Sequence, residues 1–322
     1  MNLTEPPANA TLHQALSVII KVCMVIPFFL LFLCCIIVIL HIFASYRHLL
    51  DTSRYILFAH MLVNDTLQLL TSVLLFLLVM GQVHFIFVYC APLLVLATVT
   101  FRNTPLILAA MSIERYIAII YPLQHPAAWR SDRTWVIMLS VWITNSIILV
   151  TDFSIGEKKP AEDLFTTPVL CKPAVVNSSL IQRVFSAVID VLIFALVAVV
   201  ILFTYVKILL ETRKLKQNRI SVSKAMHTVL LHGIQLLLCI LAYTQPITQR
   251  LILLHANWSP EDISFFNFFC FILIPRFLSP LIYGFRDQSL MSYVRKSVSC
   301  CSNSVTPHIR GTLQISTTSS TG

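Results

Sequence analysis

The sequence predicts an all-α membrane protein, a seven-transmembrane helix bundle with the N-terminus outside and the C-terminus in the cytosol. Three observations support this prediction. The 322 residues are 57% apolar and only 11% charged, whereas about a quarter of the residues of a soluble domain are charged. Seven apolar stretches are long enough to cross a bilayer, which takes about 20 residues. Basic residues are concentrated on one side of these stretches, and such a bias marks the cytosolic side.

The apolar stretches set the predicted order of elements. Helices that cross the membrane are expected at 17–44, 54–80, 89–121, 134–155, 184–210, 225–253 and 262–285. They form one membrane domain, 17–285, after an extracellular N-terminal segment, 1–16. The region 286–301 alternates apolar and basic residues, as does an amphipathic helix that lies on a membrane surface. The Ser/Thr-rich region 302–322 is expected to be a disordered cytosolic tail.

The predicted orientation depends on where the positive charges and the glycosylation motifs fall. With the N-terminus outside, 15 of the 23 Lys and Arg lie on cytosolic segments, in agreement with the positive-inside rule. The motif Asn-x-Ser/Thr, an acceptor for N-linked glycans, then falls on the outer face at Asn2, Asn9, Asn177 and Asn257. No cleavable signal pattern precedes the first helix, so we expect this helix to act as the signal anchor.

Two groups of cysteines differ from the cysteines inside the spans. Cys90 and Cys171 are the two on the predicted outer face, and a pair in an oxidising compartment predicts a disulfide. Cys300 and Cys301 lie at the end of the predicted surface helix, where palmitoylation anchors chains to membranes.

Four ionisable residues lie clearly inside the membrane part of the predicted spans: Asp65, Arg102, Asp190 and Arg276. Charges inside a membrane are costly and often functional. A helix rises about 1.5 Å per residue, which places Arg102 and Asp190 both in the outer half and Asp65 and Arg276 both near the middle. We therefore expect two ion pairs, Arg102–Asp190 and Asp65–Arg276. Each pair could simply pack the bundle; alternatively, the outer pair recognises a ligand and the lower pair acts as a switch.

Several function classes find no support in the sequence. There is no His-x-x-x-His pair, serine elbow or facing aspartate pair, so we expect no enzyme, no metal site and no cofactor. The positive charge follows the membrane topology, so we expect no nucleic acid partner. Proline-broken spans leave a seven-helix transporter as an alternative.

The third span ends in Glu114-Arg115-Tyr116, and the seventh ends in Ser279-Pro280-Leu281-Ile282-Tyr283. With the Cys90–Cys171 pair, Trp142, Asp65 and Tyr205 at matching positions, the chain resembles a rhodopsin-like (class A) G-protein-coupled receptor. Within that family it is most similar to odorant (olfactory) receptors of the fish type. The segments that carry this similarity are Met111 to Leu123, Lys224 to Thr228 and Pro280 to Arg286.

The sequence also departs from the family pattern. Ile36 and Ile37 stand where most members have Gly-Asn, Thr244 stands for a tryptophan, and Ser279 stands for an asparagine.

The resemblance implies a multi-pass plasma-membrane receptor whose partners are a small-molecule odorant, a heterotrimeric G protein and the lipid bilayer, with arrestin as a further expected partner. A non-olfactory class A receptor for a peptide or lipid ligand is the alternative within the family. We expect the ligand to contact Thr98, Arg102, Asp190, Tyr243 and Gln249. The resemblance implies that the switch and the G-protein contact use Asp65, Glu114, Arg115, Tyr116, Tyr205, Arg276, Pro280 and Tyr283.

Overall fold

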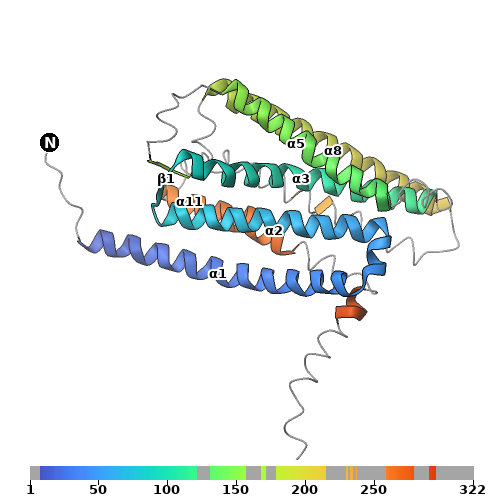
Figure 1. Ribbon diagram of the computed structural model, residues 1–322, viewed down its shortest axis with the longest axis horizontal. Coiled ribbons are helices and arrows are strands. Elements are labelled where there is room, and N and C mark those ends of the chain that lie inside the picture. Colours follow the sequence, from blue (N-terminus) through green and yellow to red (C-terminus); the bar gives the residue numbers. More distant parts are fainter. Residues whose placement is uncertain are drawn as a thin grey trace, which may run out of the picture.

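The computed structural model is an elongated helical bundle (Figure 1). It describes residues 8–121, 131–156, 168–171, 179–214, 230, 233, 234, 237, 259–278 and 290–294. The helices are α1 (Ala8–Ser45), α2 (Ser53–Met80), α3 (Phe87–Ile120), α5 (Ser131–Ile155), α8 (Leu180–Lys214) and α11 (Pro260–Asn267). A 3₁₀ turn, η1 (Arg47–Asp51), follows α1, and a π-helical turn, η2 (Phe268–Leu273), follows α11.

The helices extend beyond the predicted spans. The helix α1 begins at Ala8, well before residue 17, and α8 covers 180–214 where 184–210 was predicted. Hydropathy locates the part of a helix that lies in lipid, but the backbone hydrogen bonds continue into water wherever the local residues permit helix. The predicted sixth span lies outside the described residues except for four helical positions, 230, 233, 234 and 237.

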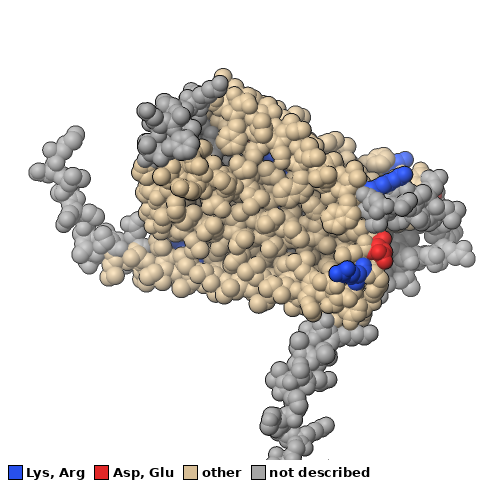
Figure 2. Space-filling model, in the orientation of Figure 1, with Lys and Arg blue, Asp and Glu red and all other residues tan. Residues whose placement is uncertain are grey.

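Five described helices are long and apolar enough to cross a membrane: α1, α2, α3, α5 and α8. Large apolar side chains on their outer faces are exposed, for example Leu16, Ile147 and Leu196. Figure 2 shows uncharged side chains along the length of one face, whereas the described charged side chains that stand out gather at one end. Such a surface is suited to lipid tails along its length and to water at that end.

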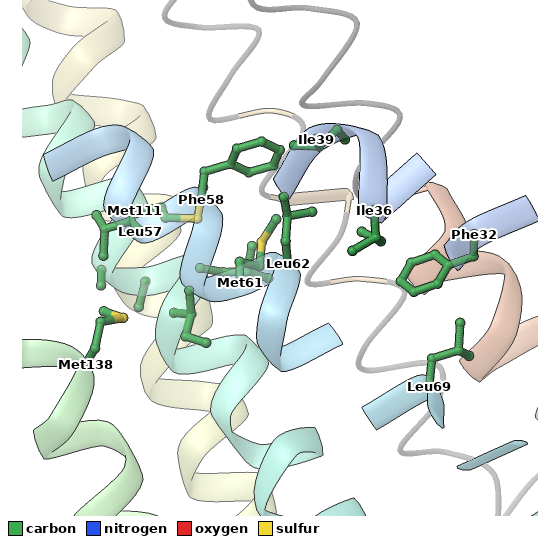
Figure 3. Close-up of a cluster of buried hydrophobic side chains, with 14 of the residues drawn as sticks. Phe32, Ile36, Ile39, Leu57, Phe58, Met61, Leu62, Leu69, Met111 and Met138 are labelled. Carbon is green, nitrogen blue, oxygen red and sulfur yellow. The ribbon is translucent and has the colours of Figure 1, made fainter. Parts of the chain in front are cut away.

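The centre of the bundle is formed by α2 and α3, which bury more of their apolar windows than the other spans do. Apolar side chains from α1, α2, α3, α5 and α8 meet in one core, part of which is drawn in Figure 3. Phe32 and Ile36 come from α1, Met61 from α2, Met111 from α3 and Met138 from α5. The α2–α3 pair therefore forms the frame against which the polar side chains described below are held.

One end of the bundle, the disulfide end, carries the Cys90–Cys171 bond, with the two Cα atoms 5.8 Å apart. The strand β1 (His84–Ile86) precedes α3, and β2 (Pro168–Leu170) precedes Cys171. They pair antiparallel with His84 opposite Leu170. The predicted disulfide is thus confirmed, and both the strand pair and the bond tie the segment before α8 to the top of α3.

The helix α11 also begins at the disulfide end. Ser259 caps it: its Oγ accepts a hydrogen bond from the Asp262 backbone N–H, and Pro260 occupies the first turn. Lys21 of α1 contacts the Asp262 carboxylate at 2.6 Å. Because Lys21 is buried, it is part of the α1–α11 packing.

At the opposite end of the bundle, the residues around η1 pack against the short described helix 290–294. The rings of Tyr46 and Tyr293 lie 4.4 Å apart, and the Tyr293 hydroxyl is 3.3 Å from His48 Nε2. Leu290 is fully buried. The segment 290–294 therefore packs under α1, within the region where a membrane-surface helix was predicted.

Candidate functional site: two buried polar clusters

The first cluster joins α3, α5 and α8 toward the disulfide end. This three-helix cluster consists of Arg102, Asp152, Ser186 and Asp190. Arg102 Nε donates to Asp190 Oδ1 at 2.6 Å, and Arg102 Nη2 donates to Ser186 Oγ at 2.8 Å. Ser186 Oγ donates in turn to Asp152 Oδ2 at 3.2 Å. One arginine thereby links two acids on two different helices, directly and through a hydroxyl.

The Arg102–Asp190 pair predicted from the sequence is present, but two members of the cluster were missed. Asp152 lies close to the end of the fourth predicted span, where charges are common, so it was not counted among the ionisable residues inside the membrane. In the structure its side chain is buried. Ser186 stands four residues before Asp190, on the same face of the helix. This spacing was the available signal for Ser186.

The three-helix cluster is closed on its deeper side by aromatic rings. Phe194, one turn beyond Asp190 on α8, lies edge-on to Phe101 with the ring centroids 6.2 Å apart. Phe194 is buried. Edge-to-face pairs at this distance pack favourably, so the polar face of α8 ends at Asp190.

The second cluster, the central network, lies between α2, α3, α5 and the helix that follows η2. Arg276 Nη1 donates to Asp65 Oδ1 at 2.6 Å and to Thr104 Oγ1 at 2.8 Å. The predicted Asp65–Arg276 pair is therefore present, and it lies at the centre of the bundle because Asp65 and Arg276 are both buried.

Amide side chains extend the central network across the bundle. Asn64 Nδ2 donates to Thr104 Oγ1 at 3.0 Å, and Asn103 Nδ2 donates to Asn64 Oδ1 at 3.3 Å. Asn145 Nδ2 of α5 donates to Asn103 Oδ1 at 2.6 Å. The sequence-based reading missed these three asparagines, although uncharged amides within apolar spans are themselves a signal for interhelical hydrogen bonds.

Trp142, which the resemblance had marked, also bridges two helices. Its indole N–H donates to His60 Nε2 at 3.0 Å, and the two rings are stacked. This contact requires the Nδ1–H tautomer of a neutral His60. His60 of α2 thereby contacts Trp142 of α5 and links the two helices.

At the end opposite the disulfide, the predicted switch residues of α3 are in contact with neighbours. Arg115 Nε lies 3.6 Å from Glu114 Oε2. The Tyr116 ring lies 5.9 Å from that of Phe203 on α8. Tyr205 is partly buried against the core. Pro280 and Tyr283, the other predicted members, lie outside the described residues.

The remaining predicted ligand contacts are not brought together in the described residues. Thr98 lies one turn from Arg102 toward the disulfide end, but its hydroxyl donates to the Leu94 carbonyl within α3. Tyr243 and Gln249 lie outside the described residues, as do the modification sites Asn2, Asn177, Asn257, Cys300 and Cys301. Asn9 lies in the first turn of α1. Within the described residues no group of three or more His, Cys, Asp or Glu could hold a metal ion.

Comparison with known proteins places the chain in a family. A sequence model described as "7 transmembrane receptor (rhodopsin family)" matches residues 34–283. Odorant receptor 131-2 of Danio rerio is 29% identical over 198 residues, 61% of each chain. Olfactory receptor 2T27 of Homo sapiens is 26% identical over 264 residues, 79% of this chain and 81% of the relative. The chain thus spans about three fifths of the length of the Danio rerio relative.

Proposed function

The chain belongs to the rhodopsin family of seven-transmembrane receptors, and from this premise we propose that it is an odorant-type receptor. It is a multi-pass protein of the plasma membrane. In the proposal, a small extracellular ligand binds in the half of the bundle near the disulfide, and the opposite end activates a heterotrimeric G protein. The relatives named as odorant and olfactory receptors support the sensory assignment. We propose no catalytic role for the chain.

The proposed orientation places the disulfide end outside the cell and the C-terminus in the cytosol. The excess of basic residues on the predicted cytosolic segments supports it, as does the gathering of described charges at the end opposite the disulfide. The topology is tested by glycan removal: the wild type should show a mobility shift on glycosidase treatment, and replacing Asn2, Asn9, Asn177 and Asn257 together with Gln should abolish it. A wild type that shows no shift, or a shift that survives in the fourfold variant, would contradict the orientation.

The observation that carries the ligand site is the three-helix cluster. Soluble and membrane proteins both avoid burying charges without a purpose, and here three charged side chains and a hydroxyl from three helices meet in the outer half. Thr98, Tyr243 and Gln249 are proposed as further lining residues. Ligands commonly bind between helices of a bundle, and a site that joins α3, α5 and α8 can respond to a ligand by altering how these helices pack.

The proposed switch is an equilibrium between two packings of the bundle. A ligand shifts such an equilibrium only by its difference in affinity for the two states, and moving it from 1:99 to 99:1 takes about 5.5 kcal/mol. We propose that the Asp65–Arg276 and Glu114–Arg115 contacts belong to the resting state. Arg115, Tyr116, Tyr205, Pro280 and Tyr283 are the proposed residues of the G-protein end, where arrestin is a further proposed partner.

The test measures cAMP and calcium in cells that express the receptor, challenged with amines, amino acids, small acids and apolar volatiles. Arg102→Ala, which removes the cation of the cluster, is compared with Arg183→Ala, an exposed arginine on the same helix as Asp190. Surface levels are matched for all variants. We expect a response that Arg102→Ala loses and Arg183→Ala keeps.

Two outcomes would contradict the proposal. A response that survives in Arg102→Ala moves the ligand site away from the three-helix cluster. A well-expressed receptor that gives no second-messenger response to any compound, even with a promiscuous G protein, argues against an odorant-type receptor.

A further inference from the structure

The three-helix cluster has more negative than positive charge. It contains one guanidinium and two carboxylates, and Arg102 already donates to Asp190 and Ser186. Arg102 and Asp152 are each only 3% exposed, and the Asp190 side chain is 14% exposed. Within the described residues, Arg102 is the cation hydrogen-bonded to this cluster. Within the described residues, one of the two buried carboxylates therefore has no matching positive charge, an arrangement that is costly when left uncompensated.

Three buried polar atoms of this region make no hydrogen bond to the described residues. They are Asp152 Oδ1, Gln182 Oε1 and Arg102 Nη1. Gln182 is only 1% exposed. Two of these atoms are acceptors and one is a donor. Buried polar groups nearly always have a partner, so three together around one cluster need an explanation.

The two unpartnered acceptors lie in successive layers between the same two helices. Gln182 and Ser186 are four residues apart on α8, and Asp152 and Gly156 are four residues apart along α5 and its end. Ser186 contacts Asp152, and the Gln182 amide lies beside Gly156, where an added Cβ would come within 3.1 Å of its Oε1. One helical turn rises about 5.4 Å, so Gln182 lies one layer above Asp152 on the side of the disulfide.

We infer that the three-helix cluster binds a small organic molecule with a primary ammonium group, held by Asp152 and Gln182. The inference rests on the proposed receptor function and names its ligand class. An ammonium group has three N–H donors and one positive charge, so it satisfies both unpartnered acceptors and neutralises the excess carboxylate. Water can supply hydrogen bonds to the same atoms, but it leaves the charge uncompensated.

In this inference Arg102 does not select the charge of the ligand. The two side chains of that pair neutralise each other, and Asp152 provides the unmatched charge. The free Nη1 donor still offers one hydrogen bond to an acceptor on the ligand. Simple alkylamines and zwitterionic α-amino acids share the ammonium group. Amino acids add a carboxylate, to which Arg102 Nη1 can donate a hydrogen bond.

The Phe101–Phe194 pair limits how deep such a ligand reaches. The aromatic contact lies one turn beyond Asp190, so the polar part of the ligand stays on the disulfide side of it. A short apolar chain that packs on these rings is compatible with the site, whereas a second charge at that depth is not.

Binding is tested on the purified receptor, independently of any G protein, by the increase in melting temperature that a ligand produces. The probes are butylamine, butanol of the same chain length, butyrate, and alanine as the α-amino acid. The wild type should be stabilised by butylamine or alanine and not by butanol or butyrate. Asp152→Asn should weaken the apparent affinity about 10- to 100-fold, the usual effect of losing a hydrogen bond to a charged partner.

Two further variants separate ligand binding from structure. Asp262→Asn makes the same carboxylate-to-amide change at the disulfide end, outside the cluster, and should leave the affinity unchanged. An amide oxygen at position 152 still accepts from Ser186, so Asp152→Asn without ligand should melt at the wild-type temperature or above it. Gln182→Ala should weaken binding of the ammonium probes by a smaller factor than Asp152→Asn does.

The outcomes distinguish this inference from the proposed function. Equal stabilisation by butanol and butylamine, or ammonium binding that is unchanged in Asp152→Asn, would overturn the ammonium site. So would an unliganded Asp152→Asn variant that melts well below the wild type, because Asp152 would then be structural. Any of these results together with a G-protein response to another compound would leave the receptor function standing.

Discussion

Replacing Arg276 with methionine should leave the Asp65 carboxylate buried without the guanidinium that contacts it at 2.6 Å. Asp65 is fully buried and Arg276 nearly so. Removing one member of a buried ion pair costs about 3–5 kcal/mol, because the other charge stays in a medium that solvates it poorly. At roughly 2–4 °C per kcal/mol for chains of this size range, Arg276→Met should lower the melting temperature by about 10 °C.

The assay is thermal unfolding of the detergent-purified receptor, followed at a fixed heating rate by a thiol-reactive dye or by loss of the monodisperse peak. Asp65→Leu and the double variant Asp65→Leu/Arg276→Met complete a double-mutant cycle. The double variant removes both charges together, so it should melt well above either single variant.

A matched ion pair provides the control. Lys21–Asp262 has the same 2.6 Å separation, but the Asp262 side chain is 46% exposed. Lys21 is buried, but the Asp262 carboxylate is solvated and an amide at position 262 keeps an acceptor for Lys21, so the loss should be near that of an exposed pair, about 0–1 kcal/mol. Asp262→Asn should therefore shift the melting temperature by no more than about 4 °C. The reasoning is refuted if Arg276→Met melts within 2 °C of wild type, or if the two single losses simply add in the double variant.

Three further changes test other contacts by the same melting assay. Trp142→Phe removes the donor to His60 Nε2 and should cost about 1 kcal/mol; a loss above 3 kcal/mol would mean that packing, not the hydrogen bond, dominates. Cys171→Ser opens a link across 81 residues and should cost about 4–5 kcal/mol by loop entropy, so surface expression should fall sharply; wild-type expression would contradict this. Ser259→Ala removes the cap of α11 and should cost about 1 kcal/mol, whereas Ser259→Asp should restore the loss.

The fold and the two ion pairs could be predicted because they depend on simple regularities of the sequence. The length of an apolar stretch identifies a spanning helix, and a fixed rise per residue gives the depth of each charge along it. Depth alone was enough to match Arg102 with Asp190 and Asp65 with Arg276. The Cys90–Cys171 bond followed from the orientation, since both cysteines then share the outer face.

Other features depend on how each helix is rotated about its axis, which depth does not reveal. Asp152 lies near the end of its span, and only its rotation toward α8 makes it part of the cluster. Gln182 and Ser186 could have been found as earlier members of the face that carries Asp190, at spacings of four and eight. The π-helical turn at Phe268–Leu273 has no sequence signal, since its apolar residues are equally suited to an α-helix.

Three consecutive residues of α3 connect the two polar clusters. Successive positions on a helix are about 100° apart, so Arg102, Asn103 and Thr104 face three different neighbours. Arg102 contacts α8, Asn103 contacts both α2 and α5, and Thr104 contacts Arg276 beyond η2. A ligand that displaces Arg102 acts on this one turn of α3, and the same turn contacts the amides and the buried ion pair of the central network. The two clusters therefore share one continuous set of contacts, through which coupling between them would pass.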